Sequence, residues 1–213
     1  MKRMMALLLA MVLLLGCTPA MALEKKYQSV LLGTTVTLPK NLDVITEIPL
    51  QEQDGSLIFF SIPDSNVTVI GTMYYVPEFE GLQTKDLPKE EIEGWKEYFS
   101  ADYPKHSRGV MLRPPYNSSQ RIFRYYGMNK TGSWILSYSG VRDGLYVSVS
   151  AEAERFGYKA DVMKAIFEAF NDCFQMFAMS RGVEFTRYDP DDFDVVIFNL
   201  LYDDSPESIF RNY

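Results

Sequence analysis

The sequence predicts an α+β protein: an antiparallel β-sheet covered by helices at about 89–102 and 159–180, with a C-terminal helical tail. Three observations lead to this fold class. Short runs of β-branched and aromatic residues, separated by turn-forming residues, fill the first half of the chain. Residues 145–151 alternate between apolar and polar side chains, which is typical of an antiparallel strand with one buried face. Residues 159–180 carry an apolar stripe with helical spacing.

An export signal precedes this domain. Lys2 and Arg3 form a positively charged start, and residues 6–15 form an apolar run that is too short to cross a bilayer comfortably. We predict a signal peptide over residues 1–22, or over residues 1–16 if the chain is a bacterial lipoprotein. We therefore expect an exported protein of the periplasm or the cell surface.

Residues 13–22 (LLLGCTPAMA) fit two cleavage reactions. Ala20 and Ala22 are the small residues that a signal peptidase accepts. Gly16 and Cys17 instead resemble a bacterial lipobox, in which the cysteine carries lipid. Attachment to a membrane is then expected only through Cys17, because no later apolar run approaches the ~20 residues of a transmembrane helix.

Length and charge limit the classes of protein. Residues 23–182 have the length of a single domain, and residues 183–213 form a C-terminal helical extension. The chain has 21 basic and 28 acidic residues, a net charge of −7. Because an acidic surface repels phosphate groups, we expect no nucleic-acid partner.

Three strands are predicted in the first half, at residues 36–39, 57–62 and 67–76. Asp54 and Gly55 form a turn before the second strand, and a Pro-Asp-Ser-Asn cluster precedes the third. Gly71 within the third strand marks a bulge or a point of close approach. The helix that follows can be capped by Asp86 and carries Pro88 in its first turn.

The second half is predicted to begin with a loop at 105–119. Three strands follow, at residues 121–127, 133–139 and 145–151. Residues 140–144 (GVRDG) are a natural hairpin connection between the last two strands. The long helix 159–180 then ends at Gly182, which can adopt the left-handed conformation. Its apolar stripe includes Cys173, which we interpret as a buried core residue without an intramolecular disulfide partner.

Few residues are candidates for chemistry. His106 is the single histidine, and no nucleophile-elbow or nucleotide-binding motif occurs, so we predict no catalytic residues and no cofactor. Asp189, Asp191 and Asp194 are a weak candidate for a calcium site. We favour no metal, because these acidic residues suit the first turn of a helix and no EF-hand pattern follows.

Tyrosines are the remaining candidates for binding. Adjacent tyrosines on a strand point to opposite faces, so each predicted pair places one ring outward. Tyr75, Tyr126 and Tyr146 then form a flat platform for a sugar or a peptide. The alternative interpretation is ordinary covering of the sheet, with the rings packed in cross-strand pairs or under the helices.

The stretches VTLPKNLDV (36–44) and LIFFSIPDSNVTVIGTMYY (57–75), followed by a helix, three strands and a long helix, resemble the PsbP-like α/β/α sandwich. In bacteria that fold occurs in small exported proteins and lipoproteins, often without known activity. The resemblance implies a fold and transfers no functional residue, because fold does not determine function.

We therefore expect an exported, non-catalytic cell-envelope protein that binds or scaffolds an unknown envelope protein. One alternative is a module that binds a small ligand or glycan through its sheet tyrosines. The other is an uncharacterised enzyme that uses carboxylates alone, because Asp and Glu are too common in the sequence to single out.

Overall fold

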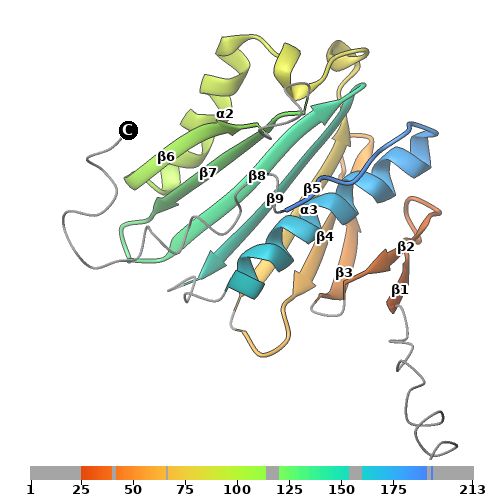
Figure 1. Cartoon of the computed structure of the whole chain (residues 1–213), viewed down its shortest axis with the longest axis horizontal. Helices are drawn as coiled ribbons and strands as arrows, with labels where there is room; N and C mark the ends of the chain where they lie inside the picture. Colours follow the sequence, from red (N-terminus) through yellow and green to blue (C-terminus); the bar gives the residue numbers. More distant parts are fainter. Residues whose placement is uncertain are drawn as a thin grey trace, which may run out of the picture.

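A seven-stranded antiparallel sheet forms the centre of the molecule (Figure 1). The computed structural model describes residues 25–39, 42–65, 67–113, 120–153, 160–190 and 193. In order across the sheet, the strands are β3 (Asp43–Pro49), β4 (Gly55–Ser61), β5 (Thr68–Tyr75), β9 (Leu145–Ala153), β8 (Trp134–Arg142), β7 (Ile122–Met128) and β6 (Lys105–Leu112).

The other elements cover this sheet. A separate antiparallel pair consists of β1 (Lys25–Gln28) and β2 (Thr35–Leu38). The α-helices of the described chain are α2 (Lys89–Asp102) and α3 (Ala160–Arg181), and the short 3₁₀ helices η1 (Pro77–Phe79) and η2 (Thr84–Asp86) precede α2. The predicted α+β class is confirmed, and both predicted helices agree with the structure to within a residue at each end.

One face of the sheet packs against α3. The helix contacts β9, β5 and β8 of the main sheet and also β2 (Figure 1). Its stripe of aromatic and small residues is fully or almost fully buried, and Cys173 within it is free and buried, as predicted. At Gly71 on β5 the helix comes so close that an added Cβ would lie 2.4 Å from the Cys173 sulfur. Gly71 is therefore a point of close approach.

The opposite face carries α2 over one end of the sheet. This helix contacts β7 and β6. Phe99 of α2 stacks on Tyr125 of β7, with ring centroids 5.2 Å apart, and Phe123 and Ile135 complete this smaller core. Because α2 reaches only this part of the sheet, Ile70 on β5 remains partly exposed on the same face.

The chain after α3 returns along the helix. Gly182 adopts a left-handed conformation (φ 67°), as predicted, and the Val183 amide donates to the Ala178 carbonyl, which ends the helix. The following residues, 183–190, are named here the return segment. Tyr188 in this segment is buried and stacks on Phe170 of α3, with centroids 6.0 Å apart. The return segment thus extends the core across the α3 face of the sheet.

The structure corrects the loop predicted at 105–119, because Lys105–Leu112 form β6 at the edge of the sheet. The first residues of β6 are exposed, so their sequence lacks the apolar alternation of a half-buried strand. Strand β3 was also missed. Its Glu47 points inward, where it accepts hydrogen bonds from Tyr27 (2.9 Å) and Ser29 (2.7 Å).

The structure corrects the predicted cap of α2 and confirms the predicted hairpin between β8 and β9. Asp86 does not cap α2, whose N-cap is Pro88 without a side-chain hydrogen bond. Asp86 instead closes η2 by accepting a hydrogen bond from the Gln83 amide (3.1 Å). The predicted hairpin between β8 and β9 is confirmed, with Asp143 and Gly144 both at positive φ (51° and 78°).

Candidate ligand pocket

A pocket of about 560 Å³ lies between α2 and the open part of the sheet. Strands β5, β9 and β8 contribute its sheet side, and α2 and the residue after it contribute the other side. We name it the aromatic pocket, because its lining includes Tyr74, Trp95, Tyr98, Phe99, Tyr103 and Tyr146.

The inner aromatic rings of the pocket pack against one another, which fixes their positions. Trp95 meets Tyr146 edge-on with centroids 5.3 Å apart, and Phe123 at 5.8 Å. Tyr74 packs against Tyr146 at 4.7 Å, because the two residues are directly opposite in the β5–β9 register. Tyr98 lies at the exposed side, with 76% of its surface accessible. The pocket therefore has fixed inner rings and one exposed outer ring.

A row of hydroxyl groups runs along the sheet beside these rings. The Ser139 and Ser148 hydroxyls are 2.9 Å apart, and Ser150 donates to Ser137 at 3.1 Å. Ser139 and Ser148 also lower the pKa of the nearby Tyr146 phenol, in opposition to the larger effect of burial. Because Ser148 and Ser150 line the pocket, this row gives the sheet side a polar strip.

The tyrosine phenols that line the pocket stay protonated, and the lining carries a negative charge on Asp102. Burial raises the pKa of Tyr74 and that of Tyr146 above the usual value for tyrosine. Burial, with a hydrogen bond to Glu152, raises the pKa of Tyr103 to about 12. These phenols keep their protons at neutral pH and can donate hydrogen bonds to a ligand. Asp102 contributes the single charge among the described lining residues.

Two of the three tyrosines of the predicted platform, Tyr75 and Tyr146, both line a smaller hollow beside the aromatic pocket, and Tyr126 lies elsewhere. Tyr146 also lines the aromatic pocket. Tyr75 points to the other face of β5, where the Arg181 guanidinium lies 4.9 Å from its ring centroid and its hydroxyl donates to Glu80. Tyr126 is 3% exposed and belongs to the core on the α3 side, so it contributes to no outward platform.

Sequence reasoning missed Tyr74, Trp95 and Tyr98. The β5–β9 register places Tyr74, and not Tyr75, on the face of Tyr146. An error of one residue in register exchanges the two faces of a strand, and the sequence alone did not determine this register. A usable signal was the spacing of Trp95 and Phe99 on one face of α2, which indicated a helix packed on aromatic residues.

The other candidate residues form no site within the described chain. Asp191 and Asp194 lie outside the described residues, as do Cys17, Ala20 and Ala22, and Asp189 is exposed. No group of three or more His, Cys, Asp or Glu side chains in the described ranges is placed to hold a metal ion. Burial raises the pKa of the Cys173 thiol well above its ordinary value, which favours the protonated and less nucleophilic form.

Comparisons with known proteins give a structural similarity and no match in sequence. No model of a protein family matches the chain, and no curated protein matches it. The structure is similar to the solution structure of cyanobacterial PsbP (CyanoP) from Synechocystis sp. PCC 6803, with a TM-score of 0.41 and 9% identity. The match covers 74% of this chain and 95% of that chain. The resemblance predicted from the sequence thus has a counterpart among solved structures, and it concerns the fold alone.

Neither α2 nor α3, the α-helices of the described residues, is both long and apolar enough to cross a bilayer. The apolar surface of α3 is instead used inside the protein, where it packs on the sheet.

Proposed function

We propose that this chain is a non-catalytic binding protein of the cell envelope and that the aromatic pocket is its ligand site. The single observation that carries the proposal is the pocket itself. A volume of about 560 Å³ lies within the usual range for small-molecule sites. Its combination of aromatic rings with a few hydroxyl groups and one carboxylate is also typical of such sites.

The same lining favours binding over catalysis. Hydrolysis by carboxylates alone needs two acidic groups on either side of the scissile bond. Among the described residues, the lining of the aromatic pocket offers Asp102 alone, and the acids Glu78 and Glu91 line the adjoining hollow beyond the shared rings of Tyr74, Trp95 and Tyr146. His106 stacks beside Trp134 on the β6 side of the sheet, and Cys173 of α3 is buried against β5, so they form no catalytic pair.

The edge strand β3 is poorly suited to pair with a strand of another protein, which favours a small ligand over a protein partner. Strand β3 presents exposed Ile45 and Ile48, which would suit the protein-binding hypothesis. However, the register shifts between Val44 and Thr46, and the strand ends at Pro49. Bulges and prolines are the features that discourage the addition of a further strand.

The proposal includes export. The signal region 1–22 is removed after Ala22, or after residue 16 with lipid on Cys17. The intact mass of the protein purified from its native envelope distinguishes these routes. A chain beginning at Leu23 supports the soluble form, and one beginning at an acylated Cys17 supports the anchored form. A chain that still begins at Met1 contradicts export by either route.

Ligand binding is tested with the fluorescence of Trp95. The chain has two tryptophans, so Trp134→Phe leaves Trp95 as the only one. The purified variant is titrated with a panel of sugars, amines, aromatic acids and short peptides. We expect at least one class to shift the Trp95 emission and to raise the melting temperature, because a ligand that binds only the folded state stabilises it.

Tyr98→Ala supplies the specific variant. Tyr98 is exposed, so its loss removes one side of the pocket with little effect on folding. Glu97→Ala is the matched control, since Glu97 is exposed on the same helix and outside the pocket. Binding should weaken in Tyr98→Ala and persist in Glu97→Ala. The proposal is overturned if no compound shifts Trp95, or if both variants bind as the parent does.

A further inference from the structure

A second hollow of about 410 Å³ adjoins the aromatic pocket. The two share Tyr74, Trp95 and Tyr146, so these three rings form the boundary between them. On its far side the second hollow is lined by residues around η1, including Glu78 and Phe79. One set of aromatic rings therefore faces both spaces.

The far wall of this hollow is fixed by the turn between β8 and β9. The Val76 amide donates to the Gly144 carbonyl (2.8 Å), and the Gly144 amide donates to the Phe79 carbonyl (2.8 Å). The Gly81 amide donates to the Asp143 carboxylate at 2.9 Å. The wall is thus formed before a ligand arrives, which reduces the entropy lost on binding.

The charges along both spaces have one sign. Asp102 lines the aromatic pocket, and Glu78 and Glu91 line the second hollow. The described lining of both contains no lysine or arginine. An acidic ligand would therefore meet only like charge in the lining, because the Arg181 guanidinium, which packs on the ring of Tyr75, is already paired with Asp54.

We propose that the two hollows form one groove that takes an extended saccharide chain without acidic groups. The inference rests on the proposed function and names the class of its ligand. The shared rings of Trp95, Tyr74 and Tyr146 lie in the middle of the groove. One sugar unit occupies the aromatic pocket, and the chain continues past these rings toward Phe79.

A saccharide can interact with both the aromatic rings and the polar groups of the groove. A sugar ring has an apolar C–H face that packs on aromatic rings and hydroxyl groups at its edge. The row of Ser148, Ser150 and the Tyr146 phenol offers donors and acceptors to those hydroxyls, and Asp102 accepts from them. A purely apolar ligand would bury these groups without new hydrogen bonds, which costs free energy.

The test uses β-1,4-linked N-acetylglucosamine oligomers of one to four units, followed by the emission of Trp95 in the Trp134→Phe protein. Galacturonate oligomers of the same lengths are the acidic comparison. We expect the tetramer to bind about tenfold more tightly than the dimer, because it gains contacts in the second hollow. We expect galacturonate oligomers to bind at least about tenfold more weakly than the neutral ones at low salt.

Phe79→Ala tests the second hollow by itself. It should weaken the tetramer severalfold and leave the dimer unchanged. Leu82→Ala is the matched control, because Leu82 is half-buried in the same loop and outside both linings. Its affinity for both oligomers should equal that of the parent. Equal losses for dimer and tetramer in Phe79→Ala contradict the continuation of the groove.

The outcomes separate this inference from the proposed function. If other compounds of the panel shift Trp95 and saccharides do not, the ligand class is wrong and the pocket remains a binding site. If saccharides bind with the same affinity at every length, the single groove is wrong. If no compound of either experiment binds, both proposals are overturned.

Discussion

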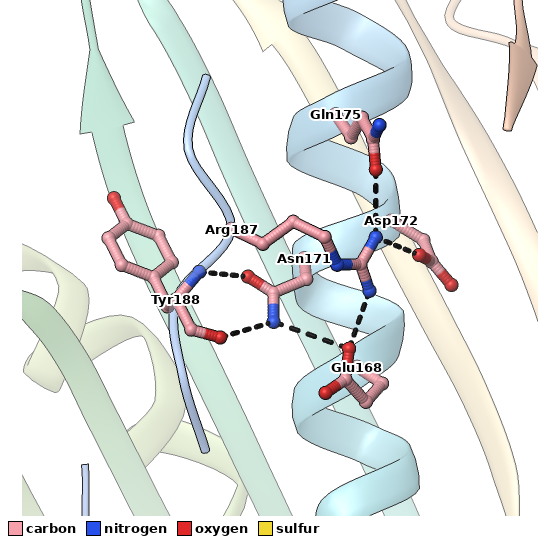
Figure 2. A network of polar contacts seen from close by, with 6 residues as sticks. All are labelled: Glu168, Asn171, Asp172, Gln175, Arg187 and Tyr188. Atoms are coloured by element: carbon pink, nitrogen blue, oxygen red, sulfur yellow. Dashed lines mark hydrogen bonds and ion pairs between the residues drawn. The ribbon is translucent and has the colours of Figure 1, made fainter. Parts of the chain in front are cut away.

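Arg187 of the return segment forms an ion pair with Asp172 of α3, with Nη1 and Oδ1 2.6 Å apart and the Asp172 side chain fully buried. The same guanidinium reaches Glu168 through Nη2 at 2.5 Å (Figure 2). Next to it, the Asn171 side chain accepts from the Tyr188 amide and donates to the Tyr188 carbonyl, both at 2.9 Å. These contacts fasten the return segment to the helix and complete the core on that face.

Burial and the excess of carboxylates over cations in this cluster predict an unusually high pKa for Asp172. One arginine meets two carboxylates, and the Oδ2 atom of Asp172 has no hydrogen-bond partner among the described residues. Burial therefore raises the pKa of Asp172 to about 7; Arg187 acts in the opposite direction, and Glu168 raises the value further. Because the folded value lies above the unfolded one, the stabilising proton is bound at low pH and lost as the pH rises toward 7.

Asp172→Asn should remove this dependence on pH. Between about pH 4 and 7 the free energy of unfolding of the parent should fall relative to that of the variant, by at most ~1.4 kcal/mol per pH unit. Urea unfolding of both proteins at pH 5.0 and 7.5 measures the difference. If the parent instead gains stability over the variant as the pH rises, the pKa of Asp172 is lower in the folded protein than in the unfolded one, and the assignment is wrong.

Arg187→Met should destabilise the protein, because it leaves two neighbouring carboxylates near the core without their cation. Loss of one partner from a buried ion pair typically costs about 3 kcal/mol, and the partial exposure of Arg187 reduces this figure. Adding Asp172→Asn to Arg187→Met should restore part of the loss, since one carboxylate is then neutral. Thermal unfolding of the four proteins checks this, and strictly additive effects contradict the coupling of the two residues.

The sequence predicted the elements whose side chains follow a regular pattern. Strand β9 alternates, and α3 has a continuous apolar stripe, so both were found with nearly their final bounds. Strands β3 and β6 were missed because each departs from its pattern. β3 turns the charged Glu47 inward to Ser29, and the exposed start of β6 gives no apolar signal. Such departures depend on tertiary contacts, which local propensity does not contain.

The candidate site was predicted less well, for a related reason. Tyr146 and Tyr75 were named and both line the second hollow, but Tyr74 was missed because the face of a strand depends on its register with the next strand. The contribution of α2 was not foreseen, since Trp95 fits equally well in a core or a pocket wall. The position of a helix on a sheet follows from packing over the whole domain.

The buried position of Cys173 predicts a slow reaction with thiol reagents. Burial raises the pKa of the thiol, and a protonated thiol is a poor nucleophile. In the protein purified with Cys17 replaced by serine, a disulfide reagent such as Ellman's should react with Cys173 only after unfolding in urea. Rapid reaction in the absence of denaturant contradicts the burial of this helix face.

Gly71→Ala tests the closest contact between α3 and the sheet. The added Cβ would lie 2.4 Å from the Cys173 sulfur and 2.8 Å from the Cγ2 atom of Ile58, so helix and strand must separate. We expect the free energy of unfolding to fall by about 1–3 kcal/mol, the usual cost of overpacking a core.

Cys173→Ala combined with Gly71→Ala should lose less stability than the sum of the two single variants, because the nearer obstacle is gone. Gly94→Ala on the exposed side of α2 is the control, since no atom beyond its chain neighbours and the backbone of its own helix lies within 4 Å of the added Cβ, and it should stabilise the helix slightly. Urea unfolding of these variants measures each effect, and a Gly71→Ala protein as stable as the parent contradicts the close approach of α3 to β5.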